Sequence, residues 1–356
     1  MRLFPLLLSV ALVGCGSTPP PAPEPEAPVE APAPPPPPKV SEQHLALFAP
    51  LPAAMEKEGG PERTEALIAL GRMLYYDPRL SSNQEQSCNT CHQLDNFGVD
   101  SEATSLGVKG ERGGRNSPTS VNAAGHFAQF WDGRAPDVET QALGPILNPV
   151  EMNMPNPGAA VTLLQSIPGY RDAFKAAFPG DDKPITYDNV GAAIGAFERG
   201  LVSPGKWDAY LEGDVNALGD VARAGVDAFI GTGCASCHMG PYVGGQMYAK
   251  LGQSVPYDTS DLGRMEVTKD EADKYMFKVP SLRNVAKTGP WLHDGSITDL
   301  EEMIRLMGKH QLGRDLDDAT VTSIRAFLGA LTGELDATYI AKPELPASGP
   351  KTPGPS

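Results

Sequence analysis

Two copies of the pattern Cys-x-x-Cys-His constrain this chain of 356 residues more than any other feature. The pattern is typical of c-type haem attachment, because two thiols bond covalently to the haem and the adjacent histidine supplies an axial nitrogen to the iron. A zinc site would place its histidine several residues away, and a redox Cys-x-x-Cys needs no histidine. We therefore expect two covalently bound haem c groups, held by Cys88, Cys91, His92, Cys234, Cys237 and His238.

The remaining cysteine, Cys15, follows a short export signal. Residues 1–14 carry Arg2 and then an apolar run that is too short to span a bilayer permanently. The segment Leu12–Cys15 resembles a bacterial lipobox, at which cleavage would leave a lipidated Cys15; an ordinary signal peptide with an incidental cysteine is the alternative. Acyl chains would anchor the protein without crossing the membrane. We expect a lipid-anchored protein on the periplasmic side of a bacterial membrane.

Composition divides the rest of the chain. Residues 15–40 are mostly Pro, Ala and Glu, which predicts an extended polyproline linker. Residues 342–356 are rich in proline and poor in large apolar side chains, which predicts a disordered tail. The roughly 300 residues between them are enough for two domains, and each half contains one haem motif. We expect an N-terminal cytochrome c domain at 41–205 and a C-terminal one at 206–341.

The apolar spacing of these domains is helical. Helices are predicted over 62–74, 189–201 and 318–331, and a capping box predicts another that begins at Thr298–Glu301. Strand signals are nearly absent, whereas Gly and Pro are plentiful between the helical segments. The sequence therefore predicts an all-α fold in which two c-type cytochrome domains, with loop-rich connections, each surround one covalently bound haem.

The second axial ligand of each iron is less constrained. The chain has six histidines, of which two are the proximal ligands, and methionine is the alternative ligand that raises the reduction potential. A methionine on a helix more often fills the core than binds a metal. Spacing alone does not choose among the methionines after the second motif, which are Met239, Met247, Met265, Met276, Met303 and Met307.

Five segments resemble the bacterial di-haem cytochrome c peroxidases and the related MauG enzymes, which mature a tryptophylquinone. They occur in the family's order across residues 60–335, and they are Ser87–His92, Phe130–Arg134, Val150–Asn153, Phe277–Asn284 and His293–Gly295. The resemblance implies a peroxidatic haem in the N-terminal half and a high-potential electron-transfer haem in the C-terminal half. It implies that Met307 is the second ligand of the C-terminal haem, where the MauG enzymes have tyrosine.

The same resemblance implies the catalytic residues. Cleavage of peroxide requires a group that moves a proton between its two oxygens and an amide that holds it, and the family places Glu151 and Gln141 in these roles. Glu151 would otherwise be a solvated loop carboxylate; its apolar neighbours Met152 and Met154 favour a raised pKa. Trp131 resembles the family tryptophan between the haems, which implies a place on the electron path, although an aromatic core residue fits the same position.

The resemblance also implies a calcium ion, bound by the Asn116 side chain and by the backbone carbonyls of Thr288 and Pro290. One departure from the family concerns residues 104–110, the loop in which many members carry a distal histidine on the peroxidatic haem. Val108 occupies that position here and cannot bind iron, and His126 lies too far along the chain. We therefore expect an open or water-bound peroxidatic haem even when both irons are ferric.

The implied activity is that of a cytochrome-c peroxidase (EC 1.11.1.5 type), which reduces hydrogen peroxide to water. The net charge of −15 disfavours nucleic acid and suits a small basic cytochrome c as electron donor, although a cupredoxin is equally compatible. Two alternatives stay open: a non-catalytic di-haem protein for electron transfer or redox sensing, and a MauG-like oxidase of a protein or quinol substrate. The oligomeric state, including a homodimer, also stays open.

Overall fold

The computed structural model describes residues 40–58, 60 and 62–355, together with Met1, Ser9, Ala11 and Gly14. The predicted lipidation site Cys15, most of the signal peptide and nearly all of the linker therefore lie outside the described residues. The chain from residue 38 onward is one unit. None of the described helices is both long and apolar enough to cross a membrane.

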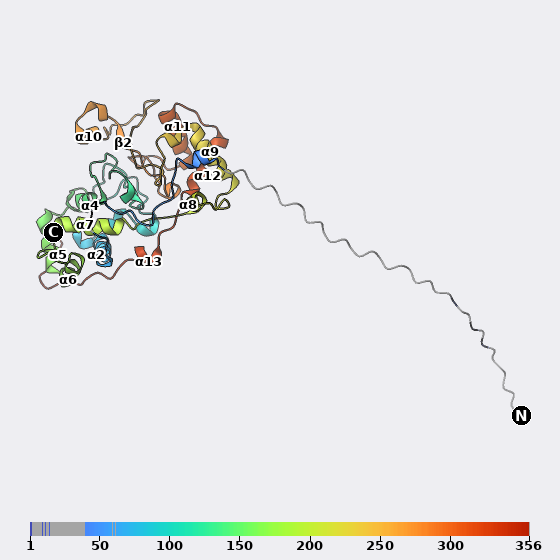
Figure 1. Cartoon of the computed structure of the whole chain (residues 1–356). Helices are drawn as coiled ribbons and strands as arrows, with labels where there is room; N and C mark the ends of the chain where they lie inside the picture. The colour runs from blue at the N-terminus through green and yellow to red at the C-terminus, as the bar shows by residue number, and fades with distance from the viewer. Residues whose placement is uncertain are drawn as a thin grey trace. The chain divides into compact units, whose positions relative to one another are not determined.

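Helices dominate the described residues, as the apolar spacing predicts (Figure 1). The longer ones are α2 (Glu65–Tyr76), α4 (Val138–Leu147), α5 (Pro157–Ser166), α6 (Pro168–Ala177), α7 (Tyr187–Glu198), α9 (Asp220–Thr232), α11 (Leu300–Leu312) and α12 (Asp318–Ala330). The shorter ones are α1 (Glu42–Leu45), α3 (Cys88–Cys91), α8 (Lys206–Leu211), α10 (Met265–Thr268) and α13 (Ala337–Ile340).

The loops between these helices contain short 3-10 helices and one small sheet. The 3-10 helices are η1 (Pro78–Leu80), η2 (Leu94–Asn96), η3 (Ala123–Gly125), η4 (Cys234–Ser236), η5 (Glu271–Asp273) and η6 (Val285–Lys287). Strands β1 (Tyr248–Lys250) and β2 (Met276–Lys278) pair antiparallel, with Tyr248 opposite Lys278. This is the only named sheet within the described ranges, so the near-absence of strand signals in the sequence is confirmed.

The four helices predicted from the sequence are α2, α7, α11 and α12, and their starts are set by side-chain caps. Thr64 caps α2 and Thr186 caps α7, each accepting a hydrogen bond from a backbone N–H of the first turn. Helix α11 starts one residue later than the capping box suggests. Its cap is Asp299, which accepts from the Glu302 N–H at 2.8 Å, rather than Thr298.

Two pairs of packed helices form the cores of the two halves: α2 against α7, and α9 against α12 (Figure 1). Each pair crosses at a glycine. A Cβ atom on Gly71 would lie 1.8 Å from the Ala193 carbonyl oxygen, and one on Gly225 would lie 2.0 Å from the Ser323 carbonyl oxygen. The backbones can approach this closely only because these two residues have no side chain.

Buried apolar side chains form two clusters. One runs from Leu67 to Leu201, and the other combines residues 207–331 with Val40 and Phe48, which come from the N-terminal segment. Phe48 packs edge-on against Trp207, with 5.3 Å between the ring centroids. The domain boundary near residue 205 stays a prediction, and the N-terminal segment contributes to the second cluster rather than to the first.

The C-terminal segment differs from the disordered tail that its composition predicts. Arg79 donates to the Pro346 carbonyl at 2.9 Å, and Gln84 donates to the Pro353 carbonyl at 2.9 Å. Thr352 and Ser166 are joined by a 3.0 Å hydrogen bond between their hydroxyls. The segment follows helices of the first half, and the chain ends near α5 (Figure 1). Donors of the first half satisfy its proline-rich backbone, which composition alone does not reveal.

Candidate haem centres

The first Cys-x-x-Cys-His follows a short loop after α2. Cys88–Cys91 form α3, and at its start the Thr90 hydroxyl accepts a hydrogen bond from the Ser87 N–H at 2.9 Å. The Tyr75 hydroxyl donates to the His92 carbonyl at 2.7 Å and fixes the end of the motif. Burial lowers the pKa of His92, so its imidazole is neutral near pH 7, the form that ligates metals.

Glu151 lies beside this first motif. Burial raises the pKa of its carboxyl, and Arg134 and Asn148 partly oppose that effect. The carboxylate is close enough to Cys91 to contribute to the raised pKa of that thiol, which burial brings to about 11. The structure therefore brings together the predicted proton-transfer residue and the first haem attachment site, in a partly desolvated setting.

The loop of residues 104–112 lies against Glu151. The Val108 N–H donates to the Glu151 carbonyl at 2.9 Å. The Ser105 side chain interacts with the Cys91 thiol by a hydrogen bond, which lowers the pKa of that thiol. Val108 is thus near the first motif, where the family loop would present a histidine. His126 instead borders the cavity of the second motif. An open peroxidatic iron stays a prediction, with no histidine from this loop available to close it.

Gln141 lies on α4, the helix that leads into the turn containing Glu151. Asp137 caps this helix by accepting from the Thr140 N–H at 2.8 Å. The Gln141 side chain is half-buried and makes no hydrogen bond to any residue that the structure describes. Its amide is therefore free to hydrogen-bond a ligand, as the predicted role requires.

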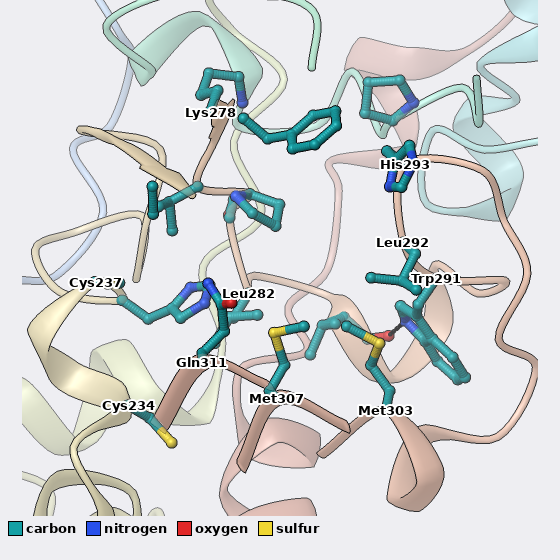
Figure 2. A pocket seen from close by; sticks show the side chains of 18 of the residues that line it. Cys234, Cys237, Lys278, Leu282, Trp291, Leu292, His293, Met303, Met307 and Gln311 are labelled. Carbon is teal, nitrogen blue, oxygen red and sulfur yellow. Dashed lines mark hydrogen bonds between the residues drawn. The ribbon is translucent and has the colours of Figure 1, made fainter. Parts of the chain in front are cut away.

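The second Cys-x-x-Cys-His borders a large cavity (Figure 2). Helix α9 ends at Thr232 with Gly233 as its C-cap, and the next residues form η4, which carries Cys234. Burial lowers the pKa of His238 to about 4, so this imidazole is also neutral near pH 7. The empty space in this cavity, including the part open to solvent, is about 1680 Å³.

Two methionines of α11 point into this cavity (Figure 2). Met303 and Met307 are one helical turn apart and therefore lie on the same face of the helix. Burial does not show which of the two methionines is the iron ligand, because both side chains are partly buried. The structure brings Met307 into the cavity of His238, as its predicted role requires, and it brings Met303 there as well.

Trp131 borders the cavity of the second motif. Its indole N–H donates to the Asn116 carbonyl at 2.9 Å. Asn116 is two residues before Pro118, whose carbonyl faces the His92 ring and raises its pKa against the effect of burial. The structure thus joins Trp131 both to this cavity and to the segment that leads to His92, and its place on an electron path stays a prediction.

The three residues proposed as calcium ligands border the same cavity. These are Asn116, Thr288 and Pro290. The Asn116 amide nitrogen donates to the carbonyls of Glu102 and Ala103 at 3.1 and 3.2 Å, which orients its side-chain oxygen away from them. Calcium binds such neutral oxygens together with water. The ion itself stays a prediction.

Comparison with known proteins identifies the family. Residues 65–216 match the model of the family described as di-haem cytochrome c peroxidase. Cytochrome c551 peroxidase of Pseudomonas aeruginosa is 43% identical over 321 residues, covering 88% of this chain and 92% of the relative. Its namesake from Nitrosomonas europaea is 45% identical over 296 residues, covering 82% and 87%. The chain belongs to the di-haem cytochrome c peroxidase family.

A solved structure agrees with this assignment. A MauG-like protein associated with microbial copper homeostasis superposes with a TM-score of 0.74 at 28% identity, covering 82% of this chain and 97% of the other. Membership in the family implies two haem c groups, and the residues of this chain fit them. The four cysteines of the two motifs are free thiols, and burial lowers the pKa of His92 and of His238, which keeps both imidazoles in the neutral form that binds iron.

The structure of this family member also contains an internal repeat that the sequence reasoning missed. Asn122 and Asn284 both adopt left-handed backbone angles, with φ of 62° and 61°, and both side chains donate to the Ser203 hydroxyl at 2.9 Å. Asp132 and Asp294, and then the helix caps Asp137 and Asp299, follow at the same offset along the chain. This constant offset in the sequence is the signal that could have revealed the repeat.

The repeat shows what differs between the two centres. At the same offset, Trp131 corresponds to His293, Gln141 to Met303 and Pro145 to Met307. The first half therefore carries proline, which cannot bind iron, at the position where the second half carries the predicted methionine ligand. Pro145 lies within α4, as Met307 lies within α11.

Proposed function

We propose that this chain reduces hydrogen peroxide to water at its first haem centre, with electrons from a small periplasmic cytochrome c or cupredoxin. The observation that carries the proposal is the asymmetry between the centres. A desolvated carboxyl, Glu151, lies beside the first Cys-x-x-Cys-His, whereas the second shares its cavity with Met307. When bound, the haems supply the peroxide-binding iron and the electrons for reduction.

Glu151 would take a proton from one oxygen of peroxide and return it to the other, so that water leaves. Desolvation raises its pKa, which brings the carboxyl closer to the pH at which it can do both. Gln141 would hold the peroxide by hydrogen bonds from its unpartnered amide. Val108 and Pro145 would keep the site accessible, because neither side chain can occupy the sixth position of an iron.

The second centre would store an electron and deliver it. His238 and Met307 would hold the iron of this haem, and a thioether ligand favours the reduced state. Trp131 would lie on the path to the first centre, since it borders the cavity of the second centre and hydrogen-bonds to the segment that contacts His92.

The decisive experiment is steady-state peroxide reduction by Glu151→Gln with a reduced cytochrome c or cupredoxin as donor. Loss of the proton-transfer group should lower turnover roughly 10²- to 10⁴-fold while both haem spectra are kept. Glu111→Gln is the matched control, because Glu111 is an exposed carboxylate of the adjacent loop. A wild-type rate in Glu151→Gln would show that Glu151 is not the proton-transfer group, whereas absence of peroxide turnover in the wild type would indicate a non-catalytic electron carrier.

A second candidate function is oxidation of a protein or quinol substrate in the manner of MauG. It is favoured by the likeness to a structure described as a MauG-like protein. Met307 favours the peroxidase, because the resemblance assigns tyrosine to this position in the MauG enzymes. Peroxide-driven oxidation of reduced quinol, measured beside cytochrome oxidation by the same preparation, separates the two functions.

The proposed location is the periplasmic face of a bacterial membrane, with the acyl chains of Cys15 as anchor. The short apolar signal and the lipobox-like Leu12–Cys15 support it. The mature wild-type protein should carry covalently bound fatty acid, measured by mass spectrometry, and Cys15→Ser should carry none. If the wild type carries no fatty acid, the anchor is wrong.

The proposed calcium site uses Asn116, Thr288 and Pro290. Their common position on one cavity supports it. Titration of chelator-treated protein with calcium should give a saturable heat signal that Asn116→Ala weakens. Magnesium is the control, since it prefers a smaller octahedral shell with several waters.

A further inference from the structure

Lys278 is a buried cation without an anionic partner. It ends strand β2, only 7% of its surface is exposed, and its backbone N–H donates to the Trp131 carbonyl at 2.8 Å. Its ammonium lies 3.4 Å from Nδ1 of His126 and makes no salt bridge among the residues that the structure describes. Burial lowers the pKa of Lys278 to about 8. A buried ammonium without a counter-charge is costly, so an anion is expected beside it.

His126 completes a pair of donors. Since the Lys278 ammonium donates to Nδ1, the other ring nitrogen, Nε2, carries the proton. Nε2 is buried and has no partner among the described residues. The ring is fixed edge-on against Tyr242, with 5.8 Å between the centroids. Two buried N–H donors on neighbouring side chains match the two oxygens of a carboxylate.

Both side chains border the cavity of the second haem motif. Figure 2 shows Lys278 at one end of that cavity and Cys234 at the other. In a haem, the vinyl groups and the propionates lie on opposite edges of the ring. Because the two cysteines hold the vinyl edge, the propionate edge must lie away from them, on the side where Lys278 is found.

We propose that Lys278 and His126 form a carboxylate-binding site that holds a propionate of the second haem and raises the reduction potential of that haem. The inference rests on the proposed second centre but not on peroxidase activity. The positive charge of Lys278 favours the state of the iron with one more electron, and burial strengthens this interaction. Lys278 is thus a tuning residue, which acts on the iron through space and through the propionate.

The internal repeat strengthens the argument. Asn116 occupies the position of Lys278 in the first half, since its backbone N–H donates at 2.8 Å to the carbonyl of His293, the counterpart of Trp131. The first half therefore has a neutral amide where the second half has a cation. This difference gives the second centre the higher potential that an electron store requires, independently of its methionine ligand.

The test is a spectroelectrochemical titration of the two-haem protein and of Lys278→Met, which removes the charge at similar volume. At the potential where the wild-type second haem is half reduced, the variant should have an oxidised-to-reduced ratio at least ten times higher. For one electron this corresponds to a shift of about 59 mV. The resonance Raman propionate band of that haem should also shift. Unchanged values in a variant that keeps both haems would overturn the proposal.

Two further variants are controls for the loss of charge in Lys278→Met. Lys250→Met removes an exposed lysine from the neighbouring strand β1 and should leave the potential unchanged. Lys278→Arg keeps the charge and should keep the potential near that of the wild type. If Lys278→Met loses its second haem, retention of haem and potential by Lys278→Arg supports the need for charge. A tenfold change of the ratio in Lys278→Arg contradicts it. Peroxide turnover, assayed separately, reports on the proposed function.

Discussion

The two halves of this molecule share the same helix packing but differ in the side chains near their haem motifs. Each half packs two helices across a glycine, and each half contains one Cys-x-x-Cys-His motif. Beside the first motif lies a carboxyl with a raised pKa, and α4, the helix that leads to this carboxyl, carries an unpartnered amide and a proline. Around the second lie two methionines and a buried ammonium. The framework fixes where two haems would sit, and a few substitutions on it would decide what each haem does.

A single scaffold can support two kinds of redox centre. A centre that reacts with a small molecule needs an accessible iron and a proton-transfer group. A centre that only stores an electron needs a closed iron and a stable reduced state. Pro145 and Met307 occupy equivalent positions in the repeat, so in the proposed assignment one residue of α4 or α11 would decide whether the iron is open or closed.

The largest expected effect comes from removing the closing ligand. Met307→Ala should open the second iron and lower its reduction potential by a sizeable part of the roughly 0.8 V range that axial ligands control. Donor-driven peroxide turnover should then collapse, because electrons would no longer be stored beside the first centre. A potentiometric titration and the donor assay measure both.

Met303→Leu is the matched control, since Met303 borders the same cavity from the preceding turn of α11. It should leave the potential nearly unchanged. If Met303→Leu lowers the potential and Met307→Ala does not, the ligand has been assigned to the wrong methionine.

The next largest effect is expected from Val108→His, which would close the first iron as the second is proposed to be closed. Val108→His would place an imidazole on the loop whose residue 108 is bonded to the Glu151 backbone. If it reaches the iron, the electron paramagnetic resonance spectrum of the oxidised protein should change from partly high-spin to fully low-spin, and peroxide binding should become slow. Val108→Asn, a polar residue that is a poor haem ligand, should keep the high-spin signal. A fully low-spin spectrum of the wild type would show that the first iron is already closed.

The haem motifs and the main helices could be predicted from the sequence, whereas the contacts around each motif could not. The haem motifs are covalent requirements, and the helices have strong apolar periodicity, so both follow from the residues themselves. The burial of Glu151 depends on a loop that folds back over it, and that contact joins residues far apart in the chain. No periodicity encodes it.

The burial of Lys278 also could not be predicted from the sequence. In the sequence it is an ordinary lysine beside Phe277 and Val279, and its charge gives no hint of burial. Only the pairing of β2 with β1, and the bond from its backbone to Trp131, put it inside the cavity wall. The tail after residue 342 is a similar case, because composition reports on its own side chains and not on the donors of Arg79 and Gln84.

A smaller effect, on the free energy of unfolding, is expected at the two glycines where the helix pairs cross. Gly71→Ala and Gly225→Ala should each reduce the free energy of unfolding by about 1–3 kcal/mol, because a methyl group would overlap a carbonyl oxygen of the partner helix. Denaturant unfolding of the haem-bound protein measures both. Gly329→Ala on α12, where a Cβ would meet nothing within 4 Å, is the control and should cost little. Equal stability of all three variants would mean that the helix pairs do not need the close approach.

The smallest effect concerns the acid limb of the peroxide reaction. Glu151 acts as a base in its ionised form, so kcat/KM should fall as the pH drops through its pKa, and burial moves that fall to a higher pH than an ordinary glutamate would give. Arg134 lowers the pKa of Glu151. Arg134→Gln should therefore move the acid limb upward, by less than about one pH unit, because Arg134 is partly exposed and solvent screens its charge. Arg112→Gln removes a neighbouring exposed charge and should leave the limb in place. A downward shift in Arg134→Gln would mean that a group other than Glu151 controls the limb.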